Sequence, residues 1–290
     1  MAINNLAKFK RGLRVKNTVL VTRRDNVLVI TLNRPEVHNA INVAMGESIA
    51  DAMDELDSDD DLVVGVITGA GGTFCSGMDL KAFLRGERSD VPDRGFAGFT
   101  DRPPQKPIVA AVEGMALAGG FEIVLACDLI VAASNASFGL PEVKRGLIAG
   151  SGGLLRFPRS IPRHVATEYA LTGGMLSAVA AHRWGMVSRL TEPGRALDEA
   201  LVLAGQIAAN APLAVRVTKR LINEASTLSR VEQLARQHAA LQEILKSDDV
   251  REGAQAFAER RAPRWGAALP VPSVSFRDTQ LFPSIIADPQ

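Results

Sequence analysis

The stretch KPIVAAVEGMALAGGFEIVLACDLIVA, residues 106–132, decides the fold of this chain. It contains one apolar run of strand length, Ile108–Val112, and all but the last residue of a second, Leu129–Ala133. A glycine-rich turn follows the first run, and the apolar segment after this turn is predicted to be a helix through Leu125. A strand, a tight turn, a helix and a second strand in this order are typical of a parallel sheet with helical crossovers.

Toward the N-terminus, the pattern predicts more sheet. The β-branched runs TVLVT (18–22) and VLVITL (27–32) flank the charged turn RRDN and predict an antiparallel hairpin. Asn42 is placed to cap a helix that runs to about Leu56, and residues 63–68 (VVGVIT) form a further buried strand. The alternation of strand and helix predicts an α/β core with mostly parallel pairing.

Beyond Pro162 the balance shifts to helix. The ranges 196–209, 212–228 and 230–246 are predicted to be successive amphipathic helices, and Pro212 suits the first turn of the second one. Four regions are therefore expected: an N-terminal extension at 1–15, an α/β core at 16–205, a C-terminal helical layer at 206–268 and an extended or disordered tail at 269–290.

Charge and cysteine content exclude several classes of function. The 33 basic and 32 acidic side chains are mixed along the chain and leave a net charge of +1, so we expect neither a nucleic-acid partner nor a membrane surface. The apolar runs are shorter than the roughly 20 residues of a membrane helix. Cys75 and Cys127 offer no disulfide framework and no paired spacing for zinc. A cytoplasmic protein without a metal is expected.

Three segments are candidates for chemistry. Residues 71–80 (GGTFCSGMDL) and 113–122 (EGMALAGGFE) each follow a strand and open a helix, and residues 136–142 (ASFGLPE) end in a second glutamate. Glycines at a helix start let a ligand approach free N–H groups. Taken singly, each segment also has a structural explanation: a tight turn, a carboxylate that compensates the helix dipole, or a Pro-Glu helix start.

Taken together and in order, these segments resemble the crotonase, or enoyl-CoA hydratase/isomerase, superfamily. The resemblance covers roughly residues 16–265. The closest apparent resemblance is to enoyl-CoA hydratases and carnitinyl-CoA dehydratases, and details such as GMDLKAFLRGE and NASFGLPE look closest to the carnitinyl-CoA dehydratases. The motifs that carry it are LNRPEVHNAIN (32–42), FCSGMDLKAF (74–83), the stretch 106–132, FGLPEVKRGLIAGSGGLLRFPR (138–159), LTGGMLSAVAAHRWGMVSRL (171–190) and REGAQAFAERRAPRW (251–265).

The resemblance implies a crotonase fold with a repeated ββα core, and it implies a site. The N–H groups of Cys75 and Gly119 are expected to form an oxyanion hole for the thioester oxygen of an acyl-CoA. Glu122 is expected to activate water, and Glu142 to donate the proton. Because both acidic positions are present, reversible hydration or dehydration by a hydro-lyase is expected. No separate cofactor is implied, since coenzyme A is part of the substrate.

The resemblance also implies a coenzyme A site and an oligomer. It implies that C-terminal helices associate in a homotrimer or a homohexamer. For Lys81 a solvated surface lysine, for Phe257 core packing and for Asp79 a helix cap remain as alternatives. The residues expected to bind substrate are Met78, Asp79, Leu80, Lys81, Gly150, Phe257 and Trp265.

Several rival functions stay open. An enoyl-CoA isomerase of the same fold needs the oxyanion hole but no activated water, and an RNA-binding relative would use the basic residues Arg216, Lys219 and Arg220. A thiol nucleophile at Cys75 is disfavoured because no histidine lies in a motif that would pair with it. Residues 86–100 are expected to form part of the wall of the acyl pocket, which leaves the acyl group unspecified.

Overall fold

The computed structural model describes residues 18–266, so the predicted extension at 1–15 and the tail at 269–290 lie outside the described residues. A six-stranded sheet forms the centre, in the order β1-β2-β3-β6-β8-β11. β1 and β2 pair antiparallel, and all other neighbours pair parallel. The predicted hairpin and the mostly parallel pairing are confirmed. The strands are β1 (Val19–Arg24), β2 (Val27–Leu32), β3 (Val64–Gly69), β6 (Ile108–Val112), β8 (Leu129–Ala133) and β11 (Arg189–Thr191).

A second, smaller sheet follows the ends of these strands. It contains β7 (Met115–Leu117), β9 (Ser137–Gly139) and β10 (Leu176–Ser177), and the isolated bridge from Cys75 to Ala116 extends it. A further parallel bridge joins Ile41 to Met78. β2, β3, β6 and β8 thus each lead into a short extended segment and then into a helix. This is the repeated ββα unit expected from the sequence.

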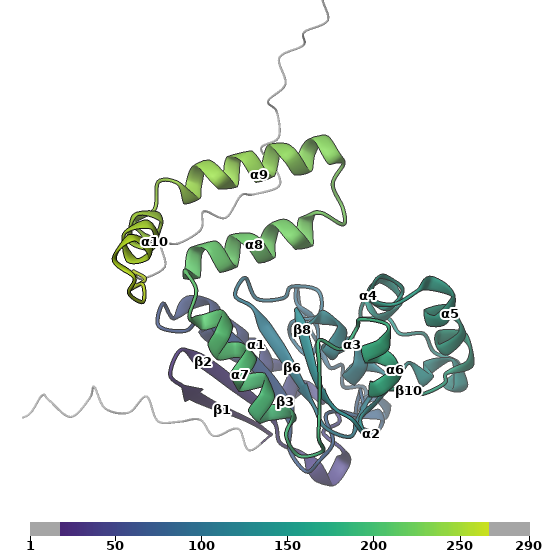
Figure 1. Ribbon diagram of the computed structural model, residues 1–290. Helices are drawn as coiled ribbons and strands as arrows, with labels where there is room; N and C mark the ends of the chain where they lie inside the picture. The colour runs from purple at the N-terminus through teal and green to yellow at the C-terminus, as the bar shows by residue number, and fades with distance from the viewer. Residues whose placement is uncertain (1–17, 267–290) are drawn as a thin grey trace, which may run out of the picture.

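Alternating side chains give the central sheet two different faces. Val27, Val29, Val64 and Val66 pack with the alanines of α7 (Ala196–Ala208) on one face. On the other face Leu28, Ile30 and Ile67 join the larger core beneath α1 (Val43–Ser58) and α3 (Gly119–Ala126). Figure 1 shows α7 along its face of the sheet. Fully buried parallel strands explain why β3, β6 and β8 are continuous apolar runs.

The helix caps follow the sequence closely. The Asn42 side chain accepts from Met45 N at 3.1 Å and begins α1 as predicted. In contrast, α8 (Pro212–Glu224) ends before the predicted residue 228, because Ser229 and Glu232 form a capping box that begins α9 (Arg230–Ile244).

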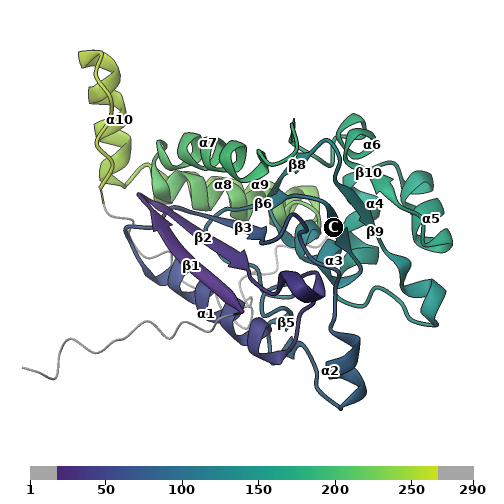
Figure 2. The ribbon, with the colours of Figure 1, turned by 90° about the horizontal axis from the view of Figure 1, so that it is seen from below.

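The remaining elements lie around the central sheet. Figures 1 and 2 show α10 at one end of the molecule and α5 at the other, and Figure 1 shows α8 and α9 set apart from the sheet. Among the described residues no single helix is long and apolar enough to cross a membrane, and α7 with α8 passes that test only as a pair bent by 108°. These elements are η1 (Pro35–Val37), α2 (Leu80–Leu84), β4 (Asp90–Val91), β5 (Gly95–Phe96), η2 (Pro141–Arg145), α4 (Gly153–Ser160), α5 (Arg163–Thr172), α6 (Ala178–Arg183) and α10 (Asp248–Glu259).

Candidate active site

Two loops meet where α2 and α3 begin. Asp79 is the N-cap of α2, and Ala118 is the N-cap of α3. Gly77 lies where the two loops touch and has φ +97°. A Cβ built on Gly77 would lie 2.9 Å from Ala118 Cβ and 3.1 Å from Gly119 N. Only glycine is compatible with both the backbone angle and this close contact. The peptide that joins Gly77 to Met78 is therefore held beside the first residue of α3.

The main chain of Cys75 is used to pair with β7. Its N–H donates to Met115 O at 3.1 Å, and its carbonyl accepts from Leu117 N at 2.9 Å. An N–H with an acceptor in the sheet cannot also bind a substrate oxygen unless the pairing breaks. The Cys75 N–H is therefore engaged in the sheet and is not free for the oxyanion role predicted for it. The sequence motif places the loop correctly but does not show which of its N–H groups the pairing uses.

The Met78 N–H lies in the same loop and takes no part in the pairing. Its bridge partner Ile41 instead donates to Gly77 O at 2.8 Å and accepts from Asp79 N at 2.9 Å. Gly119 is the first residue of α3, where an N–H has no acceptor within the helix. In residues 18–266 no acceptor is recorded for either N–H. Met78 and Gly119 are thus the donors that this junction presents.

Ala118 carries backbone strain at this junction. Its φ of 51° and ψ of −129° lie in a region that favours glycine, at a cost on the order of 1–3 kcal/mol. The strained turn is held because Ala118 N donates to Gly139 O at 2.9 Å and because Gly120 packs on Cys75. A Cβ on Gly120 would lie 2.3 Å from Cys75 O. The conformation of the turn thus depends on tight packing from both sides.

Glu122 lies in the first turn of α3, and its residue is only 3% exposed. Its Oε1 accepts two main-chain hydrogen bonds, from Ser151 N at 2.7 Å and from Gly153 N at 2.9 Å. Burial raises the pKa of Glu122, and the two N–H donors oppose this shift because they stabilise the ionised form. The carboxylate is therefore oriented by the N-terminus of α4.

Glu142 lies in η2 and is half-buried. Its Oε2 is buried, with no hydrogen-bond partner in the described part of the chain. Burial raises the pKa of Glu142, and the charge of Glu122 raises it further. The charges of the two glutamates predicted from the sequence therefore lie close enough to influence each other.

The predicted substrate loop has a structural function as well. Asp79 accepts from Lys81 N and Ala82 N, both at 3.1 Å, and pairs with Arg34 at 3.0 Å, so its alternative role as a helix cap is confirmed. Leu80 and Lys81 are exposed on α2, directly after Met78. Lys81 is therefore accessible at the edge of the junction.

The remaining predicted positions separate into two groups. Gly150 is exposed and precedes Ser151, a donor to Glu122. Phe257 is 87% exposed on α10, and Trp265 Nε1 donates to Ala209 O at 2.8 Å. Figures 1 and 2 show α10 far from α3. Within one chain, the structure does not bring Phe257 or Trp265 to the glutamates.

Sequence reasoning missed Asn39, which holds the loop before Met78. Its Nδ2 donates to Ala70 O at 2.9 Å, Thr73 O at 2.8 Å and Phe74 O at 3.1 Å. Asn39 is fully buried and has φ +55°. Asparagine adopts this left-handed conformation more readily than most residues, so its position between a predicted strand and a predicted helix could have indicated a tight turn. Its partners, however, lie more than thirty residues away along the chain and could not be assigned.

The Cys75 thiol is not suited to nucleophilic attack. Its Sγ donates to Asn39 O at 3.1 Å, and burial raises the pKa of the Cys75 thiol to about 12. A thiol in this state stays protonated at neutral pH. This agrees with the sequence argument against a cysteine nucleophile.

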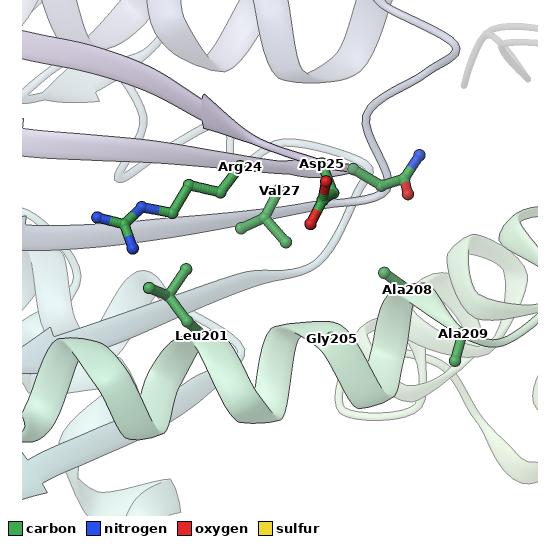
Figure 3. A pocket seen from close by; sticks show the side chains of 8 residues that line it. Arg24, Asp25, Val27, Leu201, Gly205, Ala208 and Ala209 are labelled. Atoms are coloured by element: carbon green, nitrogen blue, oxygen red, sulfur yellow. The ribbon is translucent and has the colours of Figure 1, made fainter.

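A cavity of about 460 Å³ lies elsewhere in the molecule. Figure 3 shows it between the end of the β1–β2 hairpin, with Arg24 and Asp25, and α7, with Leu201 and Ala208. Its wall at Val27 belongs to the sheet face covered by α7, whereas α3 packs on the opposite face. The cavity is therefore separate from the glutamates.

The predicted basic face of α8 is largely neutralised. Arg216 is buried, Lys219 Nζ lies 2.7 Å from Asp128 Oδ2, and Arg220 lies 3.5 Å from Glu243. Paired and buried cations contribute little to binding a phosphate backbone. The structure therefore gives no support to an RNA-binding function of this helix.

Comparisons with known proteins agree with this geometry. Residues 22–268 match the family described as Enoyl-CoA hydratase/isomerase. The chain is 57% identical to the crystal structure of enoyl-CoA hydratase EchA1 from Mycobacterium marinum, which it matches over 87% of this chain and 100% of that chain with a TM-score of 0.85. It is 40% identical to a carnitinyl-CoA dehydratase from Proteus mirabilis over 84% of this chain and 97% of that protein.

A third relative broadens the range of substrates among similar proteins. The chain is 40% identical to a mevalonyl-coenzyme A hydratase from Aspergillus fumigatus, over 83% of this chain and 91% of that protein. The names of all three relatives describe addition or removal of water. The crotonase fold expected from the sequence is confirmed, and this chain belongs to the enoyl-CoA hydratase/isomerase family.

Proposed function

We propose that this protein is a hydro-lyase that reversibly adds water across the α,β double bond of an enoyl-CoA thioester. The observation that carries the proposal is the pair of electrostatically coupled carboxyl groups, Glu122 and Glu142, beside a junction with two unpaired main-chain donors. An isomerase needs to move only protons, whereas hydration needs one group to activate water and another to protonate carbon.

The thioester oxygen is bound by the N–H groups of Met78 and Gly119. Addition of water at Cβ develops negative charge on this oxygen as an enolate-like state forms. Donors fixed at the starts of two helices stabilise that charge without reorganisation, each by about 3 kcal/mol in comparable sites. Met78 thus takes the role that the sequence analysis gave to Cys75.

The two carboxyl groups have different surroundings, which supports different roles. Glu122 accepts two N–H bonds, which favour its ionised form, so it removes a proton from water as the new bond between oxygen and Cβ forms. Glu142 has no such donors on its buried Oε2, and its raised pKa favours the protonated form, so it donates a proton to Cα. The reverse sequence removes water.

Coenzyme A binds along the loop from Met78 to Lys81. The exposure of Lys81 at the edge of the junction supports a contact between its ammonium group and a phosphate group of the coenzyme. Lys81→Ala should raise KM for the thioester and leave kcat nearly unchanged, because this contact lies away from the reacting atoms.

Association into a trimer or a hexamer is supported by the C-terminal helices. Exposed apolar side chains that form a contiguous patch mark association surfaces, and six large ones lie on or next to α8, α9 and α10. A trimer or hexamer in analytical ultracentrifugation is expected, and a monomer at micromolar concentration would contradict it. The exposed residues are Ile222, Val231, Leu234, Leu241, Leu245 and Phe257.

The decisive experiment is hydration of crotonyl-CoA by the purified chain, followed by the loss of the conjugated thioester absorbance. Glu122→Gln and Glu142→Gln should each lower kcat by about a hundredfold or more. A panel with long-chain enoyl-, crotonobetainyl- and carnitinyl-CoA identifies the acyl group. Isomerisation of a 3-enoyl thioester without any hydration, or near-normal turnover in both variants, would refute the proposal.

A further inference from the structure

Arg156 is a charged side chain that the proposed chemistry does not use directly. It lies in α4, yet its guanidinium turns back toward the start of its own helix. Nη1 donates to Ser151 O at 3.2 Å, and Nη2 donates to Thr100 O. A Cβ built on Gly152, which has φ +92°, would lie 2.1 Å from Arg156 Nη1. The guanidinium therefore rests directly on a residue that must lack a side chain.

This position is electrostatically unusual. A cation at the N-terminus of a helix is disfavoured by the helix dipole, so a nearby negative charge is needed to stabilise it. Glu122 supplies this charge, because its Oε1 accepts from Ser151 and Gly153 in the same turn. Asp101 also attracts the guanidinium. Because Arg156 is half-buried, its charge interacts with the carboxylates of Glu122 and Asp101 more strongly than it would in water.

The contacts form a short chain from Arg156 to the proposed base. The guanidinium holds the carbonyl of Ser151, and the N–H of the same residue holds Glu122. The other charged groups facing Glu122 are Asp101 and Glu142, and both carry negative charge when ionised. The positive charge of Arg156 offsets the effect of both negative charges on Glu122. The hydrogen bond from Arg156 to Thr100 O also anchors the segment proposed as the acyl-pocket wall.

We propose that Arg156 is a positioning residue, which orients the carboxylate of Glu122 through Ser151 and keeps it ionised for the activation of water. The inference rests on the proposed role of Glu122 as the base. Without the Arg156 cation, the charged side chains that face Glu122 are all negative. A higher pH is then needed to ionise Glu122. The acidic limb of the pH–rate profile therefore moves to higher pH.

The test compares four variants with the wild type. Arg156→Gln and Arg156→Met remove the cation, and Arg156→Lys retains it without the planar fork. Arg159→Gln removes an equal charge from an exposed position of the same helix and serves as the matched control. In both charge-removing variants the acidic limb of kcat should move up by about one pH unit. KM should change little, because Arg156 acts through the base.

The two remaining variants separate charge from geometry. Arg156→Lys should keep the wild-type position of the acidic limb but lower the plateau of kcat, since a compact ammonium lacks the planar fork whose two separate nitrogens donate to Ser151 O and Thr100 O. Arg159→Gln should leave limb and plateau unchanged. A loss of kcat and of melting temperature in Arg156→Gln and Arg156→Met, without movement of the limb, would mean a merely structural role and overturn the inference.

A second measurement needs no activity. NMR of isotope-labelled glutamate, with Glu122 assigned by its missing signal in Glu122→Gln, reports the ionisation of this carboxyl directly. Its titration should move to higher pH in Arg156→Gln and Arg156→Met but not in Arg159→Gln; an unchanged titration overturns the inference. If the wild type hydrates none of the thioesters, the proposed function fails, and this titration still decides the role of Arg156.

Discussion

Gly153 N donates to Glu122 Oε1 at 2.9 Å, and this contact requires that residue 153 have no side chain. A Cβ on Gly153 would lie 2.9 Å from Glu122 Cγ and 3.0 Å from its Oε1. The start of α4 thus comes close enough to fix the carboxylate.

Gly153→Ala should therefore displace the carboxylate of Glu122 and lower kcat by about tenfold to a hundredfold, the scale expected for a displacement near 1 Å. Gly205→Ala is the matched control, because a Cβ at Gly205 meets no atom within 4 Å and α7 covers the opposite face of the sheet from α3. Steady-state assays and melting temperatures of both variants check the prediction. Equal turnover in the two variants would show that the contact does not orient the base.

Gly119 lies against the ring of Phe96, and this contact gives a second prediction. A Cβ on Gly119 would lie 2.5 Å from Phe96 Cε1, and the ring is buried. Gly119→Ala should therefore shift the N–H at the oxyanion site and lower kcat by about a hundredfold. In the double variant with Phe96→Ala the clash is gone, so a large part of the activity should return.

The double-mutant cycle separates this mechanism from a general loss of function. Coupling between the two substitutions is expected because the residues are in contact. Strictly additive losses of kcat would show that Phe96 is not what a side chain at position 119 displaces. Phe96→Ala alone should retain the oxyanion donors but change the preference for acyl groups.

Cys75 should tolerate loss of its thiol. Its main-chain pairing with Met115 and Leu117 does not depend on the side chain, and the thiol is protonated at neutral pH. Cys75→Ala should keep most of kcat and lose about 1 kcal/mol of stability, from the lost hydrogen bond to Asn39 and the small cavity. Urea unfolding and steady-state rates check both parts. A collapse of kcat in a folded variant would restore a chemical role for the sulfur.

The parts of the structure that depend on nearby residues were predictable from the sequence. β6 and β8 are found with the predicted bounds, since buried parallel strands are short β-branched runs. Asn42 and Asp79 cap the predicted helices because a cap acts on N–H groups within the next turn. The glutamates were also placed correctly within their segments, one in α3 and one in η2.

The parts that depend on distant pairing were not predictable. Whether the N–H of Cys75 or of Met78 is available depends on β7, which pairs with the loop from some forty residues further along the chain. The position of the Arg156 guanidinium likewise depends on Thr100, far away in sequence. Spacing within a motif specifies neither contact, because both arise only when separate loops pack together.

Glu142 should limit the stability of the protein while it serves the reaction. Burial, and then the charge of Glu122, raises the pKa of Glu142 above its ordinary value. The folded state therefore binds this proton more tightly than the unfolded chain does. The stabilisation is fully present below the ordinary pKa and is lost as the pH rises through the raised pKa.

Glu142→Gln should accordingly melt a few degrees above the wild type at neutral and alkaline pH, because glutamine carries no charge that must be buried. At acidic pH, where Glu142 is protonated, the two proteins should melt together. Glu168→Gln, a substitution at an exposed position of α5, is the control and should follow the wild type throughout. A difference between Glu142→Gln and the wild type that does not vary with pH would show that folding does not shift the pKa of Glu142, or that packing alone changed the stability of the variant.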